Sequence, residues 1–313
     1  MTWRVLISAP YFFPVLEEFR PFLEGEGIEI VTIPVRERLN EAELLPIIEA
    51  IDGVICGDDQ FTHRVLSQAK RLKVISKWGT GIDSIDKNAA AEFGIRVCNT
   101  PNAFTNPVAD TTLGYMLCFA RQLSQMDKDI RQNIWEKPNI ISLAECTIGI
   151  VGLGNIGKAV ARRAKSFGMK IFGTDIAEVS QEFMAETALE LLPLNELMAK
   201  SDFVTLHCDL NPTSFHLIGQ HELALMKPSA YLINTSRGPV IDEPALIQAL
   251  QNQSIAGAAL DVFEIEPLPE NSPLRILENC FLAPHNANSS LAAQKHVHQS
   301  TMENLLKGLR ELG

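Results

Sequence analysis

Residues 147–158 read Thr147-Ile-Gly-Ile-Val-Gly-Leu-Gly-Asn-Ile-Gly-Lys158 and decide the fold of the segment around them. Residues 147–151 form a short, mostly apolar run with β-branched side chains, as in a buried strand. After the second glycine of the turn, Gly154, the apolar residues recur at helical spacing. In a G-x-G-x-x-G turn, the first glycine permits a tight bend, the second lets backbone approach a pyrophosphate, and the third lets helix and strand pack closely. The helix N-terminus adds N–H donors and a partial positive charge. We therefore predict a dinucleotide site at Gly152, Gly154, Asn155, Ile156 and Gly157.

An acidic residue at the end of the next predicted strand strengthens this prediction. Asp175 follows the strand Lys170–Thr174, about 20 residues after the glycines, where a carboxylate accepts hydrogen bonds from ribose hydroxyls. The same carboxylate repels a 2′-phosphate, and Ile176 beside it offers no cation to hold one. The sequence therefore predicts NAD rather than NADP as the cofactor.

Short apolar runs alternate with helical stretches along most of the chain. This alternation predicts βαβ units and parallel sheets with helices on both faces. Two series of runs indicate two doubly wound α/β domains. The expected strands of the first series are Trp3–Ser8, Ile28–Ile33, Ile51–Cys56, Lys73–Ser76 and Ile95–Cys98. Those of the second are Thr147–Val151, Lys170–Thr174, Asp202–Leu206, Ala230–Asn234, Ala256–Asp261 and Asn279–Ala283.

Two long helical patterns frame the second series. One runs from Pro107 to Arg131, and a helix of about 25 residues would span close to 40 Å, enough to connect the domains. The other, Ser290–Leu312, has no strand of its own and is expected to complete the first domain. We predict a discontinuous substrate-binding domain of residues 1–100 and 287–313, and an NAD-binding domain of residues 101–286.

Composition limits the classes of partner. The net charge is −11 with no basic run, which argues against a nucleic acid or an anionic membrane as the main partner. The N-terminal MTWRVLISAP lacks the features of a signal peptide, and no run approaches membrane-spanning length. The six cysteines are scattered singly, and His296 and His298 lack a third ligand, so we expect no metal site and a surface position for this histidine pair. A cytoplasmic location is the expectation.

Three charged residues follow successive strands of the second series. Arg237 follows the strand 230–234, Glu266 lies in the loop after 256–260, and His285 follows 279–283. In a doubly wound domain, ligands bind beyond the carboxyl ends of the strands. Each residue alone has an ordinary structural explanation, but together, beside a cofactor motif, they indicate a catalytic site.

Hydride transfer to a 2-keto acid requires three protein groups. A guanidinium such as Arg237 suits a planar carboxylate through its forked donors. A histidine such as His285 can protonate the forming alkoxide near neutral pH. A neighbouring carboxylate such as Glu266 stabilises the protonated ring and orients it.

Over essentially its whole length the chain resembles the NAD-dependent D-2-hydroxy acid dehydrogenases. The motifs that carry the resemblance are Lys77-Trp-Gly-Thr-Gly-Ile-Asp-Ser-Ile-Asp86, Asn99-Thr-Pro-Asn102, the turn 152–157, and the segments 234–242, 261–267 and 284–285. The resemblance implies a Rossmann NAD-binding domain and a flavodoxin-like substrate domain. It implies an oxidoreductase acting on CH–OH groups, and it supports the choice of Glu266 over Glu264 as the partner of His285.

The resemblance also implies further contacts and an assembly. Asp261, Thr235 and Ser236 would contact the cofactor on its nicotinamide side. The backbone of Trp78, Gly79 and Thr80 would bind the substrate carboxylate, with Lys77 and Asn102 as further anion contacts. Members of the family are usually homodimers joined through the long central helix region.

The sequence leaves the identity of the substrate open. The motifs are most similar to the D-3-phosphoglycerate dehydrogenase branch, which implies 3-phosphoglycerate. However, Cys56-Gly-Asp-Asp59 stands where that branch often has an arginine for the phosphate, and Tyr11-Phe-Phe13 and Trp78 suit an apolar tail. Glyoxylate or hydroxypyruvate reductase is therefore an alternative, as is an NADH-sensing, corepressor-like binding protein.

Overall fold

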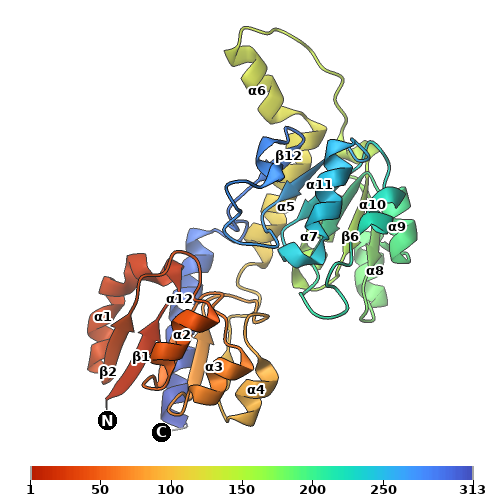
Figure 1. The fold of residues 1–313 in the computed structure, drawn as a ribbon. Helices are drawn as coiled ribbons and strands as arrows, with labels where there is room; N and C mark the ends of the chain where they lie inside the picture. Colours follow the sequence, from red (N-terminus) through yellow and green to blue (C-terminus); the bar gives the residue numbers. More distant parts are fainter. Residues whose placement is uncertain (1, 312–313) are drawn as a thin grey trace. The chain divides into compact units, whose positions relative to one another are not determined.

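The computed structural model describes residues 2–311 and divides into two compact units. Unit 1 comprises Met1–Phe104 and Ser290–Gly313, and unit 2 comprises Thr105–Ser289. Each unit is built around one parallel sheet, of five strands in unit 1 and seven in unit 2, with helices packed against it (Figure 1). The predicted fold class, two doubly wound parallel-sheet α/β domains, is confirmed.

The strand order of unit 1 is β2-β1-β3-β4-β5, the flavodoxin-like order. The strands are β1 Trp3–Ile7, β2 Ile28–Thr32, β3 Gly53–Cys56, β4 Val74–Lys77 and β5 Arg96–Cys98. The helices are α1 Leu16–Gly25, α2 Glu41–Ile48, α3 His63–Gln68, α4 Lys87–Glu92 and the C-terminal α12 Leu291–Glu311, with a 3-10 turn, η1, at Pro10–Val15. Helix α12 packs on β3, β4 and β5, so residues from both ends of the chain share one unit. Residue 312, which the sequence placed in this helix, lies outside the described residues.

Unit 2 has the strand order β12-β11-β10-β9-β6-β7-β8, in which β6 and β9 are neighbours where the order reverses. This is the Rossmann arrangement. Its strands are β6 Thr147–Val151, β7 Lys170–Thr174, β8 Glu190–Leu191, β9 Phe203–Leu206, β10 Tyr231–Asn234, β11 Gly257–Leu260 and β12 Cys280–Leu282. Its helices are α5 Thr105–Ala120, α6 Leu123–Arg131, α7 Asn155–Ser166, α8 Gln181–Thr187, α9 Leu194–Lys200, α10 Gln220–Leu225 and α11 Glu243–Gln251. The two-residue β8 was not predicted.

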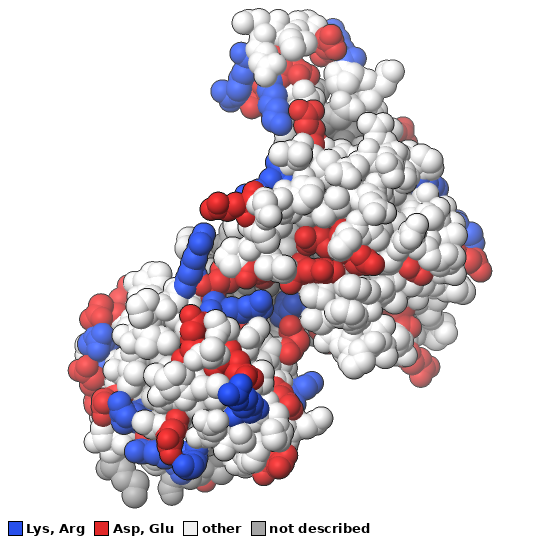
Figure 2. All heavy atoms as spheres, viewed as in Figure 1, with Lys and Arg blue, Asp and Glu red and all other residues white. Residues whose placement is uncertain are grey.

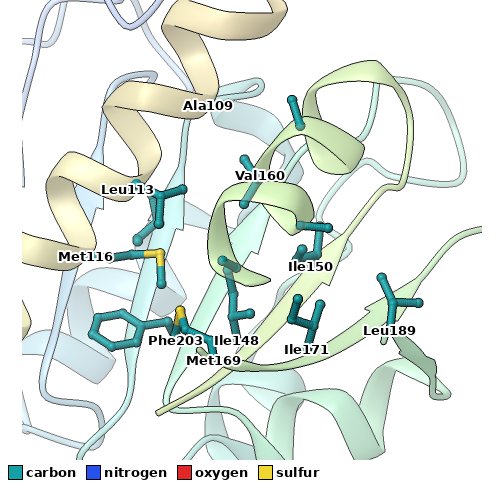
Figure 3. Packing of buried hydrophobic residues seen from close by; sticks show 14 of the residues in the cluster. Ala109, Leu113, Met116, Ile148, Ile150, Val160, Met169, Ile171, Leu189 and Phe203 are labelled. Carbon is teal, nitrogen blue, oxygen red and sulfur yellow. The ribbon is translucent and has the colours of Figure 1, made fainter. Parts of the chain in front are cut away.

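Helix α5 covers one face of the seven-stranded sheet together with α7. Leu113 and Met116 of α5 point toward Ile148 of β6 and Phe203 of β9, and all four are buried (Figure 3). Burial of such side chains contributes about 1.5–3 kcal/mol each relative to exposure. This apolar layer packs α5 and α7 onto the sheet and so positions the glycine turn, which joins β6 to α7.

The single long helix expected from 107 to 131 is wrong. The structure has α5 and α6 instead, separated at Gln122, whose φ of +48° is left-handed. The cause is packing: α5 has a buried face, whereas none of the residues of α6 is buried. All of α5 belongs to unit 2, so this helix does not connect the two units as the sequence suggested.

Acidic and basic side chains are interspersed over the visible face of unit 1, and acidic side chains gather on the visible face of unit 2 (Figure 2). Within residues 2–311, no helix has the length and apolar character needed to cross a membrane.

Candidate active site

Four loops of unit 2 leave the sheet at one edge because the strands are parallel and in register. Asn234 pairs with Leu260, and Leu260 pairs with Leu282, so the chain exits β10, β11 and β12 side by side. Likewise Val151 at the end of β6 pairs with Leu206 at the end of β9. The glycine turn and the three predicted catalytic loops therefore share the carboxyl-end edge, where ligands bind in this fold.

The glycine turn has a geometry that side chains would block. Gly152 has a φ of +92°, and a Cβ there would lie 2.6 Å from the backbone nitrogen of Cys208. A Cβ on Gly157 would lie 2.0 Å from the carbonyl oxygen of Gly152, so only glycine lets α7 pack this closely. By contrast, a Cβ on Gly154 would meet nothing within 4 Å, so open space adjoins the first residue of α7, Asn155. The turn thus leaves room for a diphosphate at the N-terminus of α7.

The Asp175 carboxylate is fastened to this turn. Its Oδ2 accepts a hydrogen bond from the Leu153 N–H at 2.5 Å, and its Oδ1 accepts one from the Ala177 N–H at 2.7 Å. Ile176 beside it is 90% exposed. An oriented carboxylate at the end of β7, next to the glycine turn, fits an adenosine ribose hydroxyl. The residues present therefore fit NAD, with the turn and α7 for the diphosphate and Asp175 for the ribose.

The structure brings His285 and Glu266 together. Nδ1 of His285 lies 2.9 Å from Oε2 of Glu266, with side-chain exposures of 23% and 19%. The other oxygen of Glu266 accepts the Phe263 N–H at 3.0 Å, which fixes the orientation of the carboxylate. His285 itself has a φ of +50°, an uncommon conformation for a residue with a side chain. Its backbone N–H donates to the Asp261 carbonyl at 2.8 Å.

Asp261 holds the turn that presents His285. Its buried carboxylate accepts the N–H groups of Asn286 at 2.8 Å and Ala287 at 2.9 Å. Burial raises the pKa of Asp261, while these two donors and His285 act in the opposite direction. The contact that the family implies for Asp261, toward the cofactor, stays a proposal. The hydrogen bonds show that the Asp261 carboxylate stabilises the turn after β12.

The Arg237 loop is shaped by Asn234 and Gly238. The Asn234 side chain donates to the Arg237 carbonyl at 2.8 Å and accepts from both the N–H and the hydroxyl of Ser236. A Cβ on Gly238 would lie 1.9 Å from the backbone carbonyl of Phe263, so this loop rests directly on the loop that carries Glu266. Thr235 is buried, with its hydroxyl 3.3 Å from that of Thr112 on α5.

The predicted substrate contacts lie in unit 1, around the end of β4. Lys77 is only 4% exposed, and its Nζ lies 3.1 Å from Oδ1 of Asp58 and donates to the Trp78 carbonyl. Gly79 has a φ of +121°, and the Thr80 hydroxyl donates to the Thr100 carbonyl at 3.0 Å. Asn102, also at positive φ, is exposed.

Trp78 belongs to an aromatic cluster that the sequence suggested only in part. Its ring stacks on Tyr11 with centroids 4.8 Å apart, and its Nε1–H donates to Nδ1 of His298 at 3.0 Å. The surface position expected for His298 is therefore wrong: the ring is buried between α12 and the aromatic residues, and its burial lowers the pKa of His298. The signal that could have shown this is the place of His298 on the apolar face of an amphipathic helix, beside Val297, Thr301 and Met302.

The structure also contains a second histidine–glutamate pair, which the sequence pattern does not predict. Nε2 of His216 lies 2.7 Å from Oε1 of Glu264, two residues before Glu266 on the same loop. The two residues are 48 positions apart, so no local spacing indicates their contact. Among the described residues no group of three or more His, Cys, Asp or Glu side chains could hold a metal ion.

Residues 113–287 match the family described as D-isomer specific 2-hydroxyacid dehydrogenase, NAD binding domain. A D-3-phosphoglycerate dehydrogenase from Methanocaldococcus jannaschii is 40% identical over 286 residues, which cover 90% of this chain and 54% of the relative. A glyoxylate reductase from Thermofilum pendens is 42% identical over 278 residues, which cover 86% of this chain and 81% of the relative. The chain thus spans about half of the first relative and most of the second.

Solved structures of similar proteins extend the match to the whole chain. The D-lactate dehydrogenase from Aquifex aeolicus, complexed with NAD and lactic acid, superposes with a TM-score of 0.85 at 25% identity, covering 99% of this chain and 97% of that one. A glyoxylate reductase from Paecilomyes thermophila has a TM-score of 0.82 at 28% identity, covering 99% and 96%.

The position of Asp175 predicts its effect on cofactor choice. In Asp175→Ala, the ratio of kcat/KM with NADH to that with NADPH should fall by at least about tenfold, because a hydrogen bond to a charged group and the repulsion of a 2′-phosphate are both lost. Glu178→Ala removes an exposed carboxylate three residues away and should leave the ratio unchanged. An unaltered ratio in Asp175→Ala would remove the ribose role from this residue.

Proposed function

Because the chain belongs to the D-isomer specific 2-hydroxyacid dehydrogenase family, we propose that it interconverts a small D-2-hydroxy acid and its 2-keto acid with NAD as cofactor. Arg237, Glu266 and His285 are the proposed catalytic residues. The observation that carries this assignment is the 2.9 Å contact between His285 and Glu266 at the edge of the sheet that also bears the glycine turn.

Each residue has a defined task in reduction of the keto acid. NADH held by the glycine turn would supply the hydride for C2 of the substrate. The Arg237 guanidinium binds the substrate carboxylate and polarises the carbonyl. His285, with Nδ1 toward Glu266, delivers a proton from Nε2 to the forming alkoxide, and the Glu266 carboxylate stabilises the imidazolium beforehand. In the oxidative direction His285 takes the same proton back.

The remaining predicted contacts are part of this proposal. Gly152, Gly154, Asn155, Ile156 and Gly157 would hold the diphosphate, with Thr235, Ser236 and Asp261 toward the nicotinamide. Trp78, Gly79 and Thr80 would contribute backbone contacts to the substrate carboxylate, with Lys77 and Asn102 as further anion contacts.

The charges around Lys77 favour a substrate with a small, uncharged tail. Lys77 is buried and its charge is offset by Asp58, 3.1 Å away, so little positive potential is left there for a phosphate dianion. The half-buried Tyr11 ring, which stacks on the buried Trp78 ring, adds an apolar group near the end of β4. We therefore place glyoxylate and hydroxypyruvate ahead of 3-phosphohydroxypyruvate as the keto acid.

The six cysteines are all unpaired, which suits a cytoplasmic enzyme.

We also propose a homodimer joined through an arm formed by residues 123–141. The arm contains α6 and the chain after it and extends away from the sheet of unit 2 (Figure 1). It exposes the large apolar residues Leu123, Ile130, Ile134, Trp135 and Ile141, and Trp135 is 81% exposed. Apolar side chains gathered in this way are typical of a surface that a partner covers, and a second copy of the chain is the occupant that the family implies.

Substrate reduction tests the function directly. The protein should oxidise NADH with glyoxylate and hydroxypyruvate faster than with 3-phosphohydroxypyruvate at equal concentrations, followed by absorbance at 340 nm. His285→Ala should lose at least about 100-fold in turnover while NADH binding persists, because the general acid is gone. Retained turnover in His285→Ala would contradict its role. No oxidation of NADH by any keto acid would contradict the enzyme assignment and favour an NADH-binding sensor.

Light scattering tests the dimer. The protein should have about twice the chain mass of 34.6 kDa, and Trp135→Asp with Ile130→Asp should shift it to the monomer. Ile276→Asp, at another exposed apolar position of unit 2, serves as the control and should remain dimeric. A wild-type protein of single-chain mass would contradict the proposal.

A further inference from the structure

The loop of residues 261–267, called the acidic loop below, carries two glutamates that contact two different histidines. Glu266 meets His285, and Glu264 meets His216 on the segment between β9 and α10. Both pairs lie within unit 2. The first pair belongs to the proposed catalytic residues, and the second has no task in that reaction.

Glu264 fastens the acidic loop to the start of helix α11. Its Oε1 accepts the backbone N–H of Glu243, the first residue of α11, at 3.1 Å and lies 2.7 Å from Nε2 of His216. In return, the backbone N–H of Glu264 donates to Oε2 of Glu243 at 3.1 Å. At Glu264 the acidic loop is therefore held by two reciprocal hydrogen bonds to the start of α11 and by a third contact to His216.

The anchored position adjoins the groups that do the chemistry. The residue before Glu264, Phe263, donates its N–H to Glu266 and so orients the carboxylate that faces His285. The same Phe263 backbone is the surface on which Gly238, next to Arg237, rests without room for a Cβ. The His216 segment is tied to this region as well, since its N–H donates to the Pro239 carbonyl at 2.8 Å.

Loss of an ordinary surface ion pair would not displace the loops that carry Glu266 and Arg237. Exposed pairs are worth little and hold nothing in place. The His216–Glu264 pair has side-chain exposures of only 35% and 27%, and its carboxylate also accepts a backbone N–H, so losing it frees backbone as well as a side chain.

We propose that Glu264 is a positioning residue of this site. With His216 and Glu243 it holds the acidic loop in the place where Glu266 meets His285 and where the Arg237 loop finds its support. The proposal rests on the proposed function, because it assigns Glu264 a part in the reaction of those three residues. Displacement of a reacting group by about 1 Å can cost 100-fold in rate, so an anchor so close to Glu266 affects turnover.

Three variants separate positioning from general stability. Glu264→Ala removes the acceptor and should lower kcat roughly 10-fold to 100-fold with little change in KM. Glu264→Gln keeps an oxygen that can accept from both Glu243 and His216 and should restore kcat to near the wild-type value. Asp202→Ala is the matched control. The Asp202 side chain is also 27% exposed, accepts one backbone N–H, from Thr147, and contacts one cation, Lys227. It precedes β9 and so lies at the amino ends of the strands, away from the site. It should lower the melting temperature without lowering kcat.

Two further measurements, the pH profile and hydrogen exchange, respond to a change of position at the site. A general loss of stability alone would not change them. In Glu264→Ala the basic limb of the keto-acid reduction profile should move to lower pH, because a displaced Glu266 stabilises the imidazolium less. In the protein without cofactor or substrate, the Phe263 amide should exchange about tenfold faster or more, because its acceptor Glu266 is no longer held.

The outcomes distinguish this proposal from the proposed function. Wild-type kcat in Glu264→Ala, an equal loss of kcat in Asp202→Ala, failure of Glu264→Gln to restore kcat, or unchanged exchange at Phe263 would each overturn the role of Glu264. A wild-type protein that reduces no keto acid would instead overturn the function. The exchange experiment still tests the anchor in that case, because it needs neither cofactor nor turnover.

Discussion

The structure of the site depends on the buried carboxylate of Asp261. It accepts two backbone N–H groups from the turn after β12, and its own backbone bonds to Asn234 at the end of β10 and to His285. Three strand ends are thereby joined at one residue. A buried carboxylate is costly without partners, and two N–H donors offset that cost. The same bonds support the left-handed backbone of His285, so the burial of one charged side chain stabilises the conformation that presents the proposed acid.

Around this centre the site uses backbone more than side chains to set its geometry. Gly238 allows the Arg237 loop to rest on the acidic loop, and Gly152 and Gly157 allow α7 to approach β6. Such close approaches leave few alternative loop positions, which suits a reaction that needs donors fixed before the substrate arrives. The net charge of −11 would repel an anionic substrate, so in the proposed reaction its attraction would depend on local groups such as Arg237.

The features that sequence predicts well are those with local physical causes. The glycine turn, the parallel strands and the placement of residues 237, 266 and 285 after consecutive strands follow from spacing and hydrophobic pattern. Long-range packing decides the features that were missed. The pattern across Gln122 is helical throughout, yet the helix breaks where it no longer has a sheet to cover. His298 and the His216–Glu264 pair depend on elements far apart in sequence, which no local pattern brings together.

The proposed reaction moves a hydride to C2 of a 2-keto acid and yields the D-hydroxy acid. The most direct measurement uses NADH carrying deuterium at both C4 positions, with hydroxypyruvate as substrate and analysis of the product by mass spectrometry and chiral chromatography. The expected product is D-glycerate with one deuterium, at C2. L-glycerate, a racemic product, or glycerate without deuterium at C2 would contradict it.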